Sequence, residues 1–580
     1  MQVWADKDDP VLAARISAGA PKKTGRPAVP PEVKPAPKVE PKKPIEPAKI
    51  APPRINPQSA LRNPQSIKVA KAIDLDIQRV LDAERICPSD RADDAEFLRR
   101  VYIDLVGKIP PPEKVIAFLD SKDADKRVKL IDELLATNDY GRHFADIWCD
   151  RINIKDMPIY REPFIDWLAD GLNQGRGWDA IVQDLMTAEG TFNFITRGKR
   201  LASNDPKALF VLLNTEEGMG KGPNPAWLAA ESGRLFLGVQ LQCAECHNHP
   251  FSKEWKQTDF WGLAAFFSQL RSVKGMQGGL AWNETPTSAG KPLNIVIPAT
   301  ALKNIGKSVP ARLLQDAKDY EPGDQQLLRH ELTRWMTSAN NPYFAKAAVN
   351  RTWAHLFGQG LVNPVDDLRA DNPASHPAIM EMLEREFKES GFDLKYLIRC
   401  ICLTDAYQRT SQPLKGNEEH HVKYSHMAVK VMSPGVFYDS LKMATGLSEL
   451  KIGLPERKTK LTVITLFTPR EVFVDFFRAS QGEEANPLEN THGIPQSLKL
   501  MNAAQLSAAS PVVQRLASSS LSREQAIEQL YLTAMARRPS SSEAKLIGDF
   551  LDRRKYATPS QAYSAVLWTL INSAEFVSNH

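Results

Sequence analysis

The sequence is poor in cysteine and has no long apolar run. Only 6 of its 580 residues are Cys, which excludes the disulfide-dense scaffold of many small secreted domains. No apolar run approaches the ~20 residues that a membrane-spanning helix requires, so no such helix is expected. The net charge of +5 is small for this length. Because no basic stripe with interleaved aromatic residues accompanies it, we expect no nucleic-acid partner.

Several common motifs are also missing. Residues 1–9 have neither the basic region nor the apolar region of a signal peptide. The sequence contains no P-loop, no dinucleotide G-x-G-x-x-G after a strand, no H-E-x-x-H and no G-x-S-x-G. These absences exclude the best-known classes of hydrolase and nucleotide-binding enzyme as interpretations of the chain. They leave open whether the chain is an enzyme.

The overall amino-acid composition is that of a folded protein, with 42% hydrophobic and 25% charged residues. A chain of this length is expected to form two to four domains. Residues 1–65 are the exception, because Pro, Lys, Glu, Ala and Val dominate them. Such a segment buries too little apolar surface to offset its ordering entropy, so we expect a disordered Pro/Lys-rich linker.

Over most of the remaining chain, apolar residues recur at helical spacing. The pattern predicts a mainly α protein with two helical domains, residues 66–274 and 323–580. A connector of loops and short strands is expected over 275–322, because this stretch contains several glycines, a Thr-Pro-Thr-Ser run and a short apolar stretch.

Capping residues predict where some helices begin and end. Ser66 is expected to cap the first helix, Asp93 or Asp94 the second, and Gly107 to end the second. We expect a helix over 224–238 that runs directly into a cysteine motif, and a cap at Thr258 or Asp259 for the helix after it. Further helices are expected over 126–136, 140–149, 161–172, 178–187, 325–336, 341–359, 377–389, 396–407, 523–537, 542–551 and 559–572.

The most specific motif is C-x-x-C-H, formed by Cys243, Cys246 and His247, with His249 two residues later. This spacing attaches haem c, because each thiol adds to a porphyrin vinyl group and the adjacent imidazole binds the iron. Chance would produce it in roughly one chain per thousand of this composition. Covalent haem c is therefore the leading interpretation, with His247 as the proximal ligand.

The distal ligand is harder to identify. His249 is too close in sequence to reach the opposite face of a haem, which leaves Met276, His355 and His376 as candidates. An open distal position would suggest small-ligand or peroxide chemistry, whereas a filled one would suggest electron transfer.

Two other interpretations of the motif stay open. Cys243, Cys246 and either His247 or His249 suit zinc, although a structural zinc site needs four ligands. Alternatively, the cysteines form a disulfide or are buried thiols beside histidines that only donate hydrogen bonds.

Two sets of polar residues in the second half each have both a structural and a functional interpretation. Arg351 and His355 are an i,i+4 pair that would line an anionic pocket or, more often, join an interhelical network with Asn350 and Trp353. Asp366 and Asp367, with Asp371 nearby, are expected to cap turns and form salt bridges rather than act as an acid–base pair.

The remaining cysteines are interpreted as structural. Cys400 and Cys402 are two residues apart on a helix, so they face apart and are poor joint metal ligands. Cys87 and Cys149 are expected to be isolated buried thiols, with a disulfide between them as the alternative.

Long stretches of the chain resemble an uncharacterised cytochrome-like family expanded in planctomycetes, which pairs two domains of unknown function. The resemblance covers about residues 67–580. One departure is that the segment after Pro469-Arg470 has no cysteine, where the family often has a C-x-C-like element. The stretches that carry the resemblance are FLRRVYIDLVGKIP (97–110), LIDELLA (130–136), RLFLGVQLQCAECHNHPF (234–251), DFWGLAAFF (259–267), NPYFAKAAVNRTWAHLFGQGLV (341–362), SHP (375–377), GFDLK (391–395), AYQR (406–409) and LINSAEFVSNH (570–580).

The resemblance implies a periplasmic, secreted or envelope protein that works with a redox partner protein or an upstream cytochrome domain. Together with the motif, it favours electron transfer or redox chemistry at a haem c. The alternative is a non-redox binding or scaffold protein with a structural zinc-type Cys/His site. An enzyme acting on extracellular polymers is a weaker alternative, suggested only by the resemblance.

Overall fold

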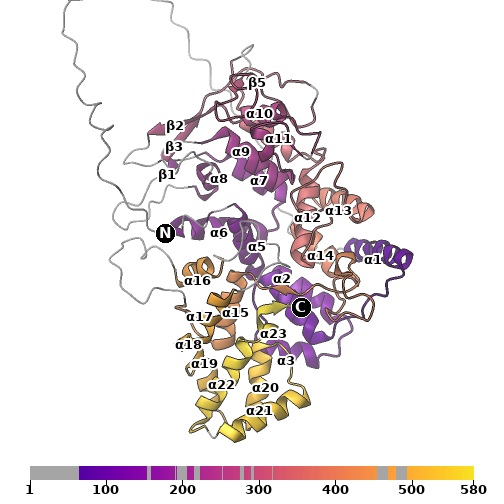
Figure 1. Cartoon of the computed structure of the whole chain (residues 1–580), viewed down its shortest axis with the longest axis vertical. Helices are drawn as coiled ribbons and strands as arrows, with labels where there is room; N and C mark the ends of the chain where they lie inside the picture. Colours follow the sequence, from indigo (N-terminus) through magenta and orange to yellow (C-terminus); the bar gives the residue numbers. More distant parts are fainter. Residues whose placement is uncertain are drawn as a thin grey trace, which may run out of the picture. The chain divides into compact units, whose positions relative to one another are not determined.

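The computed structural model describes residues 64–152, 154, 158–189, 191–192, 205–213, 223–250, 252–274, 280–288, 293–316, 318–452, 468–478, 493–554 and 556–580. Nearly all of the expected linker and the candidate ligand Met276 lie outside these residues. Within them the protein is mainly α-helical with a few short strands, which confirms the predicted fold class (Figure 1). None of the described helices is long and apolar enough to cross a membrane.

Capping explains the boundaries of the first helices. The Asp93 carboxylate accepts a hydrogen bond from Glu96 N at 2.8 Å, and Gly107 ends the helix with a left-handed φ of 68°. Both residues confirm the expected caps. The elements up to residue 213 are α1 (Gln65–Glu84), α2 (Asp94–Val106), α3 (Pro112–Asp120), α4 (Lys126–Ala136), α5 (Asn138–Arg151), α6 (Pro158–Asn173), α7 (Trp178–Thr187), β1 (Thr191–Phe192), η3 (Pro206–Ala208) and α8 (Leu209–Leu213).

Two expectations for this region are wrong. Ser66 lies inside α1, after Pro64 at the N-cap, and the Arg399 guanidinium donates a hydrogen bond to its hydroxyl. A buried tertiary partner therefore replaces the capping role. Cys87 is exposed in the loop after α1, whereas Cys149 is buried as expected; neither is in a disulfide.

Short antiparallel strands occur in the predicted connector, and two of their partners, β1 and β2, lie before residue 275. β3 lies between β1 and β2, with Ser272 opposite Trp282, and β4 pairs with β5, with Ile295 opposite Val309. The elements from residue 223 to 310 are α9 (Pro225–Ser232), η4 (Gly233–Leu237), η5 (Gln242–Glu245), α10 (Gln257–Ala265), β2 (Leu270–Lys274), β3 (Leu280–Glu284), β4 (Asn294–Val296) and β5 (Ser308–Pro310).

The second half is again helical. It includes helices between residues 434 and 517 that the apolar pattern did not single out. Its elements are α11 (Leu328–Met336), α12 (Phe344–Phe357), α13 (Pro377–Glu389), α14 (Leu394–Cys402), η7 (His421–Lys423), β6 (Lys430–Val431), α15 (Pro434–Thr445), α16 (Pro469–Arg478), α17 (Ile494–Met501), α18 (Ala504–Ser507), α19 (Pro511–Ala517), α20 (Arg523–Ala534), α21 (Ser541–Arg554), α22 (Pro559–Ile571), α23 (Ala574–Val577) and β7 (Ser578–Asn579).

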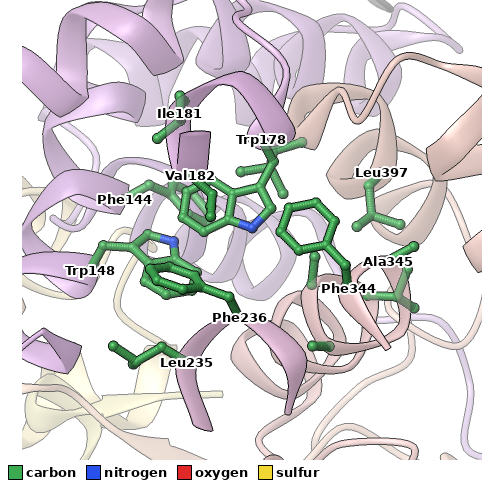
Figure 2. Packing of buried hydrophobic residues seen from close by; sticks show 14 of the residues in the cluster. Phe144, Trp148, Trp178, Ile181, Val182, Leu235, Phe236, Phe344, Ala345 and Leu397 are labelled. Carbon is green, nitrogen blue, oxygen red and sulfur yellow. The ribbon is translucent and has the colours of Figure 1, made fainter. Parts of the chain in front are cut away.

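Buried apolar side chains form two cores. The larger one joins α5, α7 and η4 of the first half to α12 and α14 of the second. Trp148 and Trp178 pack together in it with ring centroids 4.4 Å apart (Figure 2). The smaller core consists mainly of residues after 430, but Ile103 and Ile109 belong to it too. Both halves of the chain are thus packed together through shared apolar contacts.

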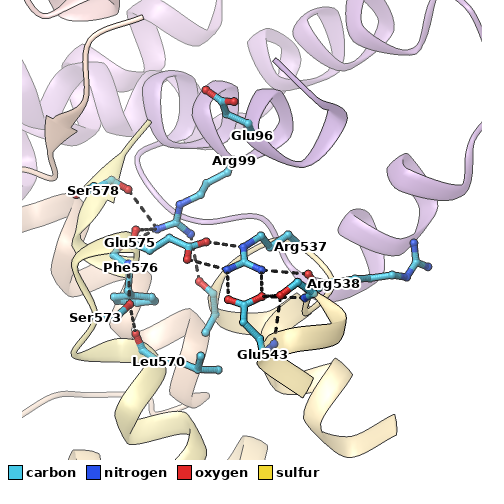
Figure 3. A network of polar contacts seen from close by, with 12 residues as sticks. Glu96, Arg99, Arg537, Arg538, Glu543, Leu570, Ser573, Glu575, Phe576 and Ser578 are labelled. Atoms are coloured by element: carbon cyan, nitrogen blue, oxygen red, sulfur yellow. Dashed lines mark hydrogen bonds and ion pairs between the residues drawn. The ribbon is translucent and has the colours of Figure 1, made fainter. Parts of the chain in front are cut away.

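Two arginine side chains, one of them buried, hydrogen-bond to the C-terminal segment and hold it against the rest of the protein. Arg99 of α2 donates to Ala534 O at 3.1 Å and to Phe576 O at 2.7 Å. Beside it, Arg537 forms ion pairs with Glu543 and Glu575 (Figure 3). Because Arg99 satisfies carbonyls that would otherwise be buried without donors, α2 and the end of the chain form one unit.

Candidate functional site

The cysteine motif follows an irregular helix end. Asn224 caps α9, but α9 ends at Ser232 and a π-helical turn, η4, continues to Gly238. The expected helix over 224–238 is therefore present, but its last turn is π-helical and residues 238–241 separate it from the motif. Gly238 has a left-handed φ of 66°, and a Cβ there would lie 3.1 Å from the Ala347 Cβ. Glycine thus lets the chain turn close to α12.

The backbone of the motif is held from inside the protein. The buried Gln257 side chain donates to Glu245 O at 3.2 Å and Cys246 O at 3.1 Å, and Trp261 Nε1 donates to Glu245 O at 2.9 Å. Gln257 is available for this because α10 begins there, after Lys256, rather than after the expected cap at Thr258 or Asp259. These bonds fix the turn that carries the thiols.

The two cysteines differ in exposure. Cys243 is exposed, Cys246 is half-buried, and neither is in a disulfide. The structure therefore has neither the disulfide nor the pair of buried thiols considered from the sequence. A thiol with this exposure is accessible for covalent attachment of a prosthetic group.

The two histidines of the motif differ in the ring nitrogen they leave available. His247 Nδ1 lies 2.6 Å from Asn248 O, so the ring donates its Nδ1 proton there, and the lone pair of the corresponding tautomer is on Nε2. His249 Nδ1 instead accepts from Ser252 N at 2.9 Å, which places its proton on Nε2. The geometry favours His247 as a metal ligand.

A preformed zinc site is not visible in the described part of the chain. There, no three His, Cys, Asp or Glu side chains are grouped so that they could hold a metal ion. A structural zinc requires four ligands in tetrahedral arrangement. Zinc at Cys243 and Cys246 would therefore need the turn to rearrange.

The two described distal-ligand candidates are engaged elsewhere. His355 Nε2 lies 2.8 Å from Asp104 O, and its ring packs against His143 and Phe144. His376 is buried against Tyr424, with ring centroids 5.3 Å apart. Each imidazole is held by partners other than the cysteine turn.

The second half of the chain contacts the segment that leads into the motif. Leu368 N donates to Gly238 O at 2.8 Å, and Gln240 Nε2 donates to Asp366 Oδ1 at 2.7 Å. Arg369 forms ion pairs with Asp367 and Asp371. As expected, these aspartates have hydrogen-bonding and salt-bridging roles, and they fix the loop against the segment before the turn.

A large cleft lies apart from the cysteine turn. It has a volume of about 1860 Å³ and is lined by residues of α2, α5, α12, α15, α16 and η4. Arg351 and His355 line it, while Asn350 donates to Val362 O and Val365 O in the loop that follows α12. Of the predicted interhelical network, the contact between His355 Nε2 and Asp104 O joins α12 to α2, and the predicted binding of an anion stays a prediction.

His143 is a cleft residue that sequence reasoning missed. Its ring centroid lies 5.6 Å from that of His355, and its Nε2 is buried without a hydrogen-bond partner among the described residues. Burial, with His355 as a second cause, lowers the pKa of His143 to about 3, and burial together with Lys430 lowers that of His355 to about 3. Both rings are therefore neutral at pH 7.

The low pKa of His143 predicts acid sensitivity. Below pH ~6.5 the unfolded chain binds a proton at this residue and the folded chain does not, so stability falls as the pH falls towards 3. Between pH 7.5 and 5 this group alone should remove about 2 kcal/mol from the free energy of unfolding. Urea unfolding of wild type and His143→Gln at both pH values measures it; equal pH dependence in the two proteins would contradict it.

Comparison with protein-family models gives two matches. Residues 72–272 match PSCyt2, a protein of unknown function (DUF1549), and residues 328–551 match PSD1, a protein of unknown function (DUF1553). Searches among curated proteins and solved structures gave no match. The chain thus has one region similar to each of these two families, in an order consistent with a two-domain family.

Proposed function

We propose that this chain is a cytochrome-like protein of the cell envelope in which Cys243 and Cys246 hold a haem c and His247 is the proximal ligand. The observation that carries the proposal is a fixed turn that presents two accessible thiols in C-x-x-C-H spacing. The resemblance to a planctomycete cytochrome-like family supports the same function and location.

The surroundings of the turn suit this group. Leu302 N donates to Cys246 O at 3.1 Å, and the Leu302 side chain is 72% exposed. Ile305 in the same loop is 58% exposed. The loop that binds Cys246 O thus leaves apolar side chains exposed, and a porphyrin held by the turn would have apolar surface near it to cover.

Each residue has a defined role in holding the group. The two thiols would form thioether bonds, and His247 would offer Nε2 while Asn248 O fixes the orientation of its ring. Gln257 and Trp261 keep the backbone of the turn in place. A bound haem c would supply one-electron redox chemistry, and its exposed position suits exchange with a redox partner protein or an upstream cytochrome domain.

Expression in a host with haem-attachment machinery tests the proposal. We expect a Soret band and a mass increase of about one haem that survives denaturation. The double variant Cys243→Ala/Cys246→Ala should lose both. A colourless protein with stoichiometric zinc that is lost in Cys246→Ala would overturn the proposal and favour a scaffold protein with a structural metal.

A further inference from the structure

A loop in the second half of the chain carries two imidazole rings close together. His421 is the first residue of η7, and His426 follows five residues later. Their ring centroids lie 6.0 Å apart, and the ring planes meet at 68°. Two imidazoles that bind one metal ion have ring centroids no more than about 6.5 Å apart, because each metal–nitrogen bond measures about 2.0–2.1 Å. The observed separation lies within this limit.

The backbone between the two rings is fixed to the rest of the protein. Tyr424, which lies between the two histidines in sequence, is 1% exposed and packs against the rings of Trp353 and Phe357. Next to it, Ser425 O accepts a hydrogen bond from Ser89 N at 2.8 Å. The loop therefore loses little conformational entropy when a ligand binds to it.

Both rings have nitrogens that the protein leaves for a ligand. No described residue forms a hydrogen bond with the ring of His421. Ser425 Oγ lies 3.2 Å from His426 Nδ1, which leaves Nε2 of that ring for a metal ion. Burial lowers the pKa of His421, and burial followed by the neighbouring His421 and His420 lowers that of His426. Both rings are therefore neutral at pH 7 and keep a lone pair.

The charges around the two rings do not oppose a cation. Burial lowers the pKa of His426, but the carboxylate of Glu418 acts in the opposite direction, because it favours a positive charge at that ring. Lys423, the basic residue between the two histidines, forms an ion pair with Glu84. A cation between the rings would thus have a carboxylate nearby, and the amine of the loop already has an acidic partner.

We propose that His421 and His426 bind a divalent ion of the late first-row transition metals, and that copper(II) binds tightest. Imidazole nitrogen suits these ions, and the Irving–Williams order places Cu²⁺ above Ni²⁺ and Zn²⁺. Two protein ligands leave the other coordination positions to water, so the ion exchanges with solution. A structural zinc site is different, because it needs a larger group of protein ligands than the described residues offer.

Calorimetric titration of the full chain, without a histidine tag, tests the site with Cu²⁺, Zn²⁺ and Mg²⁺. The background is Cys87→Ser/Cys243→Ala/Cys246→Ala, which removes the exposed and half-buried thiols and leaves the three buried ones. Neither a haem nor an accessible thiol then contributes to binding. We expect one Cu²⁺ per chain in the tightest step, weaker binding of Zn²⁺ and no saturation by Mg²⁺, which prefers oxygen ligands. The electron paramagnetic resonance spectrum of the first Cu²⁺ should show coupling to two imidazole nitrogens.

Three variants that each remove one imidazole locate the binding. His421→Ala and His426→Ala should each weaken Cu²⁺ binding about tenfold or more, since even the loss of an outer partner of a metal ligand costs about 10–100-fold. His330→Ala removes a partly buried ring of α11 beside Glu284 and should leave binding unchanged.

His421 is only half-buried, so His421→Ala keeps the test valid if His426→Ala does not fold. Unchanged Cu²⁺ affinity in His421→Ala, equal weakening in all three variants, or a spectrum without two coupled nitrogens would overturn the proposal.

Discussion

Replacement of Asp104 by Ala should destabilise the protein by about 3–5 kcal/mol, the usual consequence of leaving a buried charge without its partner. Asp104 accepts hydrogen bonds from Lys430 Nζ at 2.7 Å, Asn579 Nδ2 at 2.7 Å and Tyr407 Oη at 2.9 Å. The side chains of Asp104 and Lys430 are only 3% and 6% exposed. The variant would leave three buried donors without this acceptor, one of them a cation.

Urea unfolding of Asp104→Ala and of Glu133→Gln measures this effect. Glu133 forms an ion pair with Lys114 in which both side chains are about half exposed, so its loss should cost less than about 1 kcal/mol. Burial lowers the pKa of Lys430, so the deficit of Asp104→Ala should shrink at high pH, where the amine loses its proton more easily. Equal losses in the two variants would show that Asp104 does not join α2 to the second half.

The two histidines of the cysteine motif should respond differently to substitution. His247→Ala should lower the Soret absorbance per mole of protein by about tenfold or more, because it removes the ring whose Nε2 is left available to bind iron. His249→Ala should leave the absorbance within a factor of two, since Ser252 N already uses Nδ1 of that ring. Each variant is the matched control of the other.

The opposite order of effects would show that the ligand is His249. This outcome would require His249 to give up its bond with Ser252 or its Nε2 proton. Burial, with Arg369 as the next cause, lowers the pKa of His249, so the ring is neutral at pH 7 in either case. Equal loss in both variants would indicate that the turn needs both rings to fold.

Local signals in the sequence were sufficient for much of the fold. Asp93 and Gly107 cap α2 as expected because each acts through neighbouring backbone groups. The predicted ranges 126–136, 178–187 and 377–389 coincide with α4, α7 and α13. Ser66 was misjudged because its partner, Arg399, is 333 residues away.

The two candidate sites differ in how far sequence could reveal them. Cys243, Cys246 and His247 are adjacent in the chain, so their spacing alone identified them. His143 and His355 lie on α5 and α12, and only the packing of both halves brings their rings to 5.6 Å. Nothing local distinguishes His143 from a core histidine. The cleft therefore required the tertiary structure.

The π-helical turn before the motif could not be predicted from the sequence either. Residues 225–237 are apolar at helical spacing, which favours one continuous helix. A Cβ at Gly238, where the helix ends, would lie 3.0 Å from Leu368 Cδ1 and 3.1 Å from Ala347 Cβ, and both residues lie in the second half of the chain. The local pattern thus predicted the range of the helix but not the π-helical geometry of its last turn.

The most direct test of the proposed function is the mass of one tryptic peptide. Cleavage after Arg234 and Lys253 releases residues 235–253, which contain Cys243 and Cys246 and no other cysteine. In protein from a host that attaches haem, we expect this peptide to carry the mass of one haem and neither cysteine to react with iodoacetamide. Recovery of the peptide with both thiols alkylated and no added haem would contradict the proposal.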